Sequence, residues 1–182
     1  ASPSWDSVLL GRDVTKTATM PVQESCLIRG AGHAILRSGP LSAAMTFGPY
    51  GGFHGHFDKL SFVFFGHGEE LGVDPGRAAS QAYRLPIHRQ WYKSSVGHNV
   101  VLVDGQGQDE AGGRLLGFTT KGQYTGVAAE AGPAFKNVEH RRLLVLTPAY
   151  LLVVDELRAT DDQEHTFDWI YHNAGTAIEC DL

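Results

Sequence analysis

HRRLLVLTPAYLLVVDEL, residues 140–157, is the stretch that says most about the fold. HRRLLVL and YLLVVDEL are both rich in Leu and Val, and each is interpreted as a β-strand of period 2 with one buried face. The intervening TPAY supplies a turn that contains proline. The sequence therefore predicts an antiparallel hairpin here.

Short β-branched or aromatic runs continue on both sides of this hairpin. They are separated by Gly, Pro and Asp at near-regular spacing, and the chain holds 22 glycines, a pattern typical of a sandwich or a barrel. We predict an all-β fold whose further strands are Cys26–Ile28, Ala34–Arg37, Ala43–Phe47, Ser61–Phe65, Glu70–Val73, Asn99–Val103, Leu115–Lys121, Tyr124–Ala129 and Thr166–Tyr171.

Two segments interrupt the strand rhythm. Arg77–Ser94, RAASQAYRLPIHRQWYKS, gathers Tyr, His, Arg and Trp and predicts a long loop with a helical turn or two. Such ordered loops often carry function. Val103–Gln108, VDGQGQ, predicts a hairpin turn on Asp-Gly.

Length and charge exclude several classes of protein. At 182 residues the chain is expected to form one domain, because a split would leave each part marginal. A formal charge of −5, with 15 Lys and Arg and no basic run, argues against nucleic acid or an anionic membrane as partner. No apolar run is long enough to span a membrane. Cys26 and Cys180 could be free thiols or one bridge.

A histidine pair in FHGHFDKLSF, residues 53–62, is the first candidate for chemistry. If this stretch is extended, His54 and His56 point the same way and form half of a metal site. The alternative is that each imidazole caps a turn or hydrogen-bonds a carbonyl, so further ligands are needed.

Two further ligand candidates lie downstream. Asp74 in GVDPG follows one predicted strand, and His98 in SSVGHNVVLVDG begins another. A His/Asp/His set suits zinc or a similar divalent ion. A cupin would need a carboxylate four or five positions after the second histidine, where this chain has Leu60 and Ser61.

GGFHGHFDKLSF, LGVDPG and PIHRQWYKSSVGHNVVLVDGQGQ, taken in this order, closely resemble the metal-bearing sheets of heparinase II/III-like polysaccharide lyases. The resemblance is strong over Gly48–Gln108 and weaker over EHRRLLVLTPAYLLVVDEL and HTFDWIYHN. It implies an antiparallel β-sandwich, which in the family packs against an N-terminal helical toroid with the polysaccharide between them.

The resemblance also implies residue roles. His56, Asp74 and His98 would hold zinc with a mainly structural role, and His54 would be catalytic. Alternatively, His54 is a second histidine ligand with no part in proton transfer. Residues expected to line the substrate cleft are Tyr83, His88, Arg89 and Tyr92. Trp91 is expected to pin its loop to the sandwich. Asp58 would orient an imidazole, or else cap a turn or pair with Lys59.

The toroid that supplies the family's catalytic tyrosine and carboxylate-binding groups is not in this sequence. Residues 1–182 are therefore expected to form one sandwich domain that is incomplete at both ends relative to its parent. The function implied is the C-terminal part of a lyase that cleaves uronic-acid polysaccharides by β-elimination, in the periplasm or outside the cell. The alternative is a metal-stabilised carbohydrate-binding or structural module without catalysis. Open aromatic residues on the cleft face, such as Tyr83 and Tyr92, would favour self-association of the isolated piece.

Overall fold

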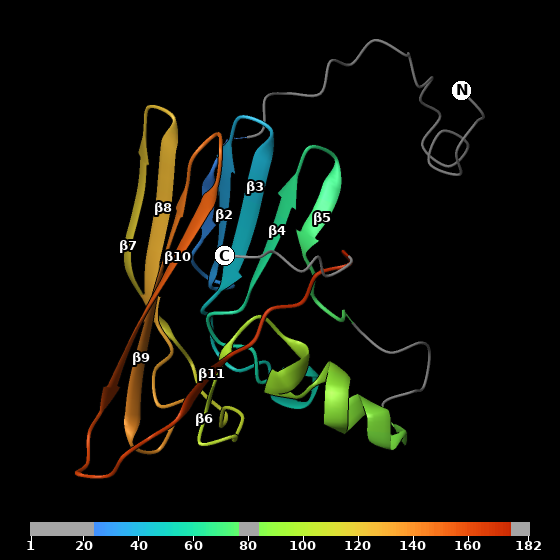
Figure 1. Cartoon of the computed structure of the whole chain (residues 1–182), viewed down its shortest axis with the longest axis vertical. Helices are drawn as coiled ribbons and strands as arrows, with labels where there is room; N and C mark the ends of the chain where they lie inside the picture. The colour runs from blue at the N-terminus through green and yellow to red at the C-terminus, as the bar shows by residue number, and fades with distance from the viewer. Residues whose placement is uncertain (1–23, 77–83, 176–182) are drawn as a thin grey trace, which may run out of the picture.

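The computed structural model describes residues 24–76 and 84–175. Within these ranges the chain forms two larger antiparallel sheets and one small one, in the strand orders β1-β2-β3-β4-β5, β10-β9-β8-β7 and β11-β6 (Figure 1). The strands are β1 Cys26–Ile28, β2 His33–Ser38, β3 Leu41–Thr46, β4 Phe62–Gly66, β5 Glu69–Gly72, β6 Val101–Val103, β7 Arg114–Lys121, β8 Tyr124–Glu130, β9 Val138–Leu146, β10 Leu151–Ala159 and β11 Phe167–Trp169.

The five-stranded and four-stranded sheets share one hydrophobic core. Leu36 and Met45 from the first sheet and Val127 and Leu144 from the second are all buried in the same cluster of apolar side chains. Along β9, buried and exposed residues alternate because successive side chains point to opposite faces. This arrangement confirms the predicted all-β antiparallel sandwich.

The β9–β10 pair confirms the hairpin predicted for residues 140–157. Its strands pair antiparallel from Val138 with Ala159 to Leu146 with Leu151. Thr147 closes the turn, since its hydroxyl oxygen accepts hydrogen bonds from the backbone N–H groups of Ala149 and Tyr150. The Asp-Gly turn is confirmed as well: Asp104 and Gly105 both have positive φ, and Val103 bridges to Gln106.

Irregular segments gather at one end of the sandwich, below β3, β4 and β5 in Figure 1. They include the short helical turns η1 Gly52–His54, η3 His88–Tyr92 and η4 Ser95–Gly97. The helical turn η3 lies inside the loop predicted over Arg77–Ser94, of which residues 77–83 are outside the described ranges. Among the described residues, no helix is long and apolar enough to cross a membrane.

Candidate metal centre

The loop between β3 and β4 carries the histidine pair. Its η1 turn ends at His54, and Gly55 then returns the backbone to an extended conformation. The loop closes at Leu60, whose N–H donates to the Thr46 carbonyl at 2.8 Å while its φ is +64°. A positive φ is costly for a branched side chain, so the surrounding structure must hold this turn in place.

His98 is the buried histidine of the site. It follows the η4 turn and has no exposed surface. Gly97 makes this approach possible, because a Cβ at this position would lie 2.4 Å from the carbonyl oxygen of Trp91. The backbone before His98 therefore packs directly against the η3 turn.

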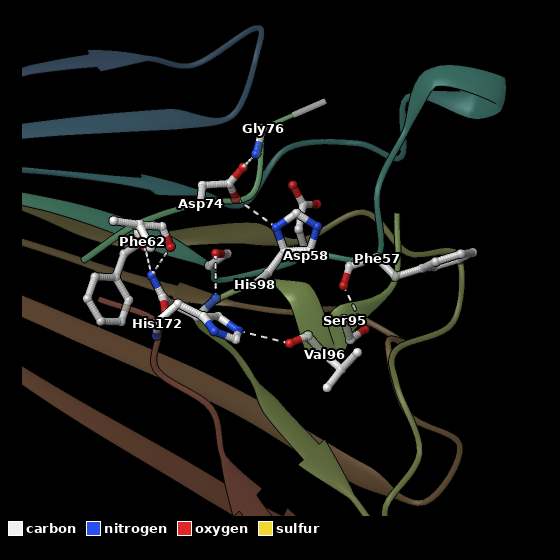
Figure 2. Close-up of polar contacts among 12 residues, drawn as sticks. Phe57, Asp58, Phe62, Asp74, Gly76, Ser95, Val96, His98 and His172 are labelled. Carbon is white, nitrogen blue, oxygen red and sulfur yellow. Dashed lines mark hydrogen bonds and ion pairs between the residues drawn. The ribbon is translucent and has the colours of Figure 1, made fainter. Parts of the chain in front are cut away.

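Asp74 reaches His98 from the end of β5. Its Oδ1 accepts a hydrogen bond from the Gly76 N–H at 2.8 Å, and its Oδ2 lies 2.7 Å from His98 Nδ1 (Figure 2). Burial by itself raises the pKa of Asp74, but the hydrogen bond and charge of His98 outweigh it and lower the pKa overall. The carboxylate and the imidazole thus hold each other in a fixed orientation.

Three ligand atoms converge beside this pair. One atom each from His56, Asp58 and His98 lies within 4.8 Å of the others, and the rings of His56 and His98 are 5.3 Å apart. Burial, and then the neighbouring His98, lowers the pKa of His56, which favours the neutral imidazole that metals bind. His98 Nε2 is buried without a hydrogen-bond partner in the described structure. An unpartnered buried nitrogen among such donors fits a divalent metal ion.

Two of the three predicted metal residues, His56 and His98, belong to the group whose ligand atoms converge. Asp74 is not in that group within the described ranges, and it contacts His98 at Nδ1, the ring nitrogen other than the unpartnered Nε2. Asp58 supplies the carboxylate of the converging group and is at the same time paired with Lys59 at 3.2 Å. The pair with Lys59 is one of the roles weighed for Asp58 from sequence, whereas its place among the candidate ligands was not predicted.

His54 stands apart from this group. The helical turn η1 replaces the extended strand in which His54 and His56 would share a face, so that expectation about the local backbone is wrong. The His54 side chain is exposed, and its ring contacts Phe53 at 5.2 Å. Its catalytic role stays a prediction.

A groove of about 790 Å³ lies beside the centre. Its lining includes Phe53 from the η1 turn and four basic side chains from the segment that contains η3, namely Arg84, His88, Arg89 and Lys93. The rings of His88 and His56 are 6.4 Å apart, so the groove and the metal residues adjoin. The lining residues among the described part of the chain include no carboxylate, which gives the groove a positive character.

Of the two other residues predicted to line the cleft, only Tyr92 lies within the described ranges. Tyr92 is half-buried and is not among the lining residues identified within the described ranges. Tyr83 lies outside the described residues. Trp91 packs against His172 with ring centroids 5.3 Å apart, which agrees with its expected role of pinning the loop.

Sequence reasoning missed the buried polar residues that support the site. Asn99 donates from its amide nitrogen to the carbonyls of Phe62 and Val73, and Val73 directly precedes Asp74. Gln108 bonds both the N–H and the carbonyl of Lys59. Arg142 donates to the carbonyls of Leu60 and Asn99. For Arg142 a signal existed, because the alternation along β9 puts it in phase with the core residue Leu144.

The comparisons with known proteins point to a single family. Residues 21–182 match the sequence profile described as "Heparinase II/III-like, C-terminal". An exo-oligoalginate lyase of Saccharophagus degradans is 29% identical over 145 residues, which are 69% of this chain and 20% of that protein. An alginate lyase of Stenotrophomonas maltophilia is 40% identical over 60 residues, or 29% of this chain and 8% of that protein.

Solved structures agree with the fold. A heparinase III structure superposes on 91% of this chain and 26% of its own length with a TM-score of 0.77 at 20% identity. A heparan sulfate lyase from Pedobacter heparinus covers 79% of this chain and 23% of its own length with a TM-score of 0.69 at 21% identity. The chain therefore spans only about a quarter or less of the proteins it matches. Since the matched profile extends over most of the chain, the protein belongs to the heparinase II/III-like C-terminal family.

Proposed function

We propose that this chain is the C-terminal part of a polysaccharide lyase that cleaves uronic-acid-containing glycans by β-elimination. The names of its relatives, which include alginate and heparan sulfate lyases, support a substrate of this class. In this proposal the rest of the parent protein supplies a helical domain against which the sandwich packs, and the enzyme acts in the periplasm or outside the cell.

The observation that carries the proposal is the positive groove beside the metal residues. Arg84, Arg89 and Lys93 line it together with His88, whose ring lies next to that of His56. Guanidinium groups bind carboxylates and sulfates through paired hydrogen bonds, and the aromatic ring of Phe53, 76% exposed, offers a face for a sugar. An anionic saccharide is the ligand that this combination fits best.

β-Elimination requires a base, an acid and a group that neutralises the carboxylate, all in a fixed geometry. A base removes the proton on C5, next to the uronate carboxylate, the C4–O bond breaks as a C4=C5 double bond forms, and an acid protonates the leaving oxygen. The proton is acidic enough only when the carboxylate is neutralised or hydrogen-bonded. The exposed imidazole of His54, next to Phe53 at the groove, suits one of the two proton-transfer roles. We assign the other role to the partner domain.

His56, Asp74 and His98 would hold a zinc ion, with Asp58 in reach of the same place. When bound, such an ion supplies a fixed positive charge that ties the loop after β3 to the end of β5 and to the turn before β6. His54 would then be held in position because His56, two residues later in the same loop, binds the ion. In this proposal the ion has a structural role.

Turnover by the full-length protein tests the proposal. Incubated with alginate or heparan sulfate, the protein should produce unsaturated uronide ends that absorb in the ultraviolet. His54→Ala should remove most of this signal, by about 10²-fold or more, while metal content is unchanged. His67→Asn is the matched control, because His67 is exposed on another turn, has a positive φ and can be replaced by Asn without strain.

Two results would contradict the proposal. Full turnover by His54→Ala would remove His54 from the chemistry. Binding of these glycans by the wild-type protein, with no unsaturated product from any of them, would favour the alternative of a carbohydrate-binding module.

A further inference from the structure

Arg142 is the largest side chain buried in the core, and its charge is compensated across the hairpin. The residue is 1% exposed. Asp155 is its direct cross-strand partner and accepts from Nε at 2.7 Å and from Nη2 at 3.0 Å. Asp155 also contacts His140 Nε2 at 2.6 Å and accepts from Trp169 Nε1 at 3.1 Å. This network leaves Nη1 of the guanidinium for other partners.

Nη1 of Arg142 bridges the two segments that carry the metal residues. It donates to the Leu60 carbonyl at 2.8 Å and to the Asn99 carbonyl at 2.7 Å. Leu60 ends the loop that holds His56 and Asp58, and Asn99 directly follows His98. One rigid, planar group therefore fixes the separation between both segments.

The carbonyl that Arg142 holds on the first segment belongs to a strained residue. Leu60 has a φ of +64°, which a leucine adopts only when neighbouring contacts enforce it. The guanidinium holds its carbonyl, and the Thr46 carbonyl holds its N–H. Without the guanidinium, the Leu60 carbonyl would be buried without that charged donor, and the turn could relax toward ordinary φ, which would displace Asp58 and His56.

The second segment connects onward to Asp74. The side chain of Asn99 donates to the Val73 carbonyl at 3.0 Å, one residue before Asp74, and accepts from the His172 N–H at 2.7 Å. Because Arg142 holds the Asn99 carbonyl, the segments of His56, His98 and Asp74 are all linked to one buried cation.

We propose that Arg142 is a positioning residue for the metal centre, which it sets through the backbone carbonyls of Leu60 and Asn99. This inference rests on the metal centre in the proposed function. Through Arg142, strand β9 would keep the His56 and His98 segments at the spacing that one metal ion requires.

Metal titration of the chain, followed by the visible spectrum of bound Co²⁺ and by competition with Zn²⁺, tests the proposal. The variant is Arg142→Met combined with Asp155→Asn, so that no uncompensated carboxylate is left in the core. Metal affinity should fall by about 10–100-fold, as it does when groups that orient ligands are removed. The Co²⁺ spectrum should change as well, because the ligands no longer meet at the same spacing.

Two controls separate positioning from general destabilisation. Arg141→Met removes the neighbouring arginine, which is exposed and paired with Glu156, and should leave metal binding unchanged. Leu144→Ala opens a cavity on the same face of β9 but removes no hydrogen-bond donor to these carbonyls, and it should lower the melting temperature, with metal affinity unchanged where the chain is folded. If the double variant does not fold, Arg142→Lys replaces it. Lysine keeps one charged donor group but lacks the planar guanidinium with its several N–H donors, so metal affinity should again fall.

The outcomes are distinguishable. A wild-type chain that binds no Co²⁺ or Zn²⁺ would overturn the metal centre itself, and with it this proposal. A wild-type chain that binds metal, beside folded Arg142 variants with the same affinity and Co²⁺ spectrum, would overturn only the positioning role.

Discussion

Single residues set how closely the loops of the site approach one another. Gly97 lets the backbone before His98 touch the carbonyl of Trp91, and Leu60 turns the other loop with a positive φ. Neither feature carries chemistry, yet each determines where a neighbouring histidine lies. At this scale the candidate site depends as much on backbone shape as on ligand atoms.

Gly97→Ala should be strongly unfavourable for this reason. The new methyl group would meet the Trp91 carbonyl oxygen at 2.4 Å, so the backbone must shift. We expect a loss of about 1–3 kcal/mol in the free energy of unfolding, measured by urea denaturation, together with weaker Zn²⁺ binding. Gly30→Ala is the control, since a methyl group there meets nothing within 4 Å. Equal stability of the two variants would show that the close approach is unimportant.

Secondary-structure elements could be predicted well wherever one face is buried. The pattern of β9 and β10 gave both the strands and their pairing, because alternation and turn chemistry are local. The same pattern could not say what Arg142 contacts. Besides Asp155, its partners are the backbone carbonyls of Leu60 and Asn99, and contacts to backbone carbonyls cannot be recognised from the sequence.

The cross-strand pair between β9 and β10 should govern stability in acid. Burial raises the pKa of Asp155, but the hydrogen bonds from His140 and Arg142 outweigh it and lower the pKa from 3.8 to about 2. Stability from this ionised carboxylate is therefore present above the unfolded pKa and is lost as pH falls from about 4 to 2. The loss should amount to about 2 kcal/mol.

Urea unfolding at several pH values between about 4 and 2 measures this contribution. Asp155→Asn should be less stable than wild type at neutral pH and should lack this part of the acid dependence. Glu156→Gln, on the exposed face of the same strand, should keep it. An Asp155→Asn variant with the full acid dependence of wild type would assign the effect to other carboxylates.

At the scale of the whole molecule, the architecture and part of the candidate site could be predicted from the sequence. Short strands and their spacing predicted the sandwich, and the motifs predicted that His56 and His98 would meet and that Asp74 would lie beside His98. The helical turn at His54 and the entry of Asp58 into the group could not be foreseen, because they depend on how a loop of glycines closes against other loops. The substrate is a proposal, since the chain spans about a fifth of the alginate lyase relative.

In our proposal, loops from three parts of the chain form one metal centre. An anomalous difference map of crystals of this chain soaked with Zn²⁺ tests this proposal. We expect a single peak bounded by ring nitrogens of His56 and His98 and a carboxylate oxygen of Asp74 or Asp58, each at about 2.0–2.2 Å. No peak at this position in crystals that hold zinc elsewhere, or a peak that leaves both His56 and His98 uncoordinated, would contradict it.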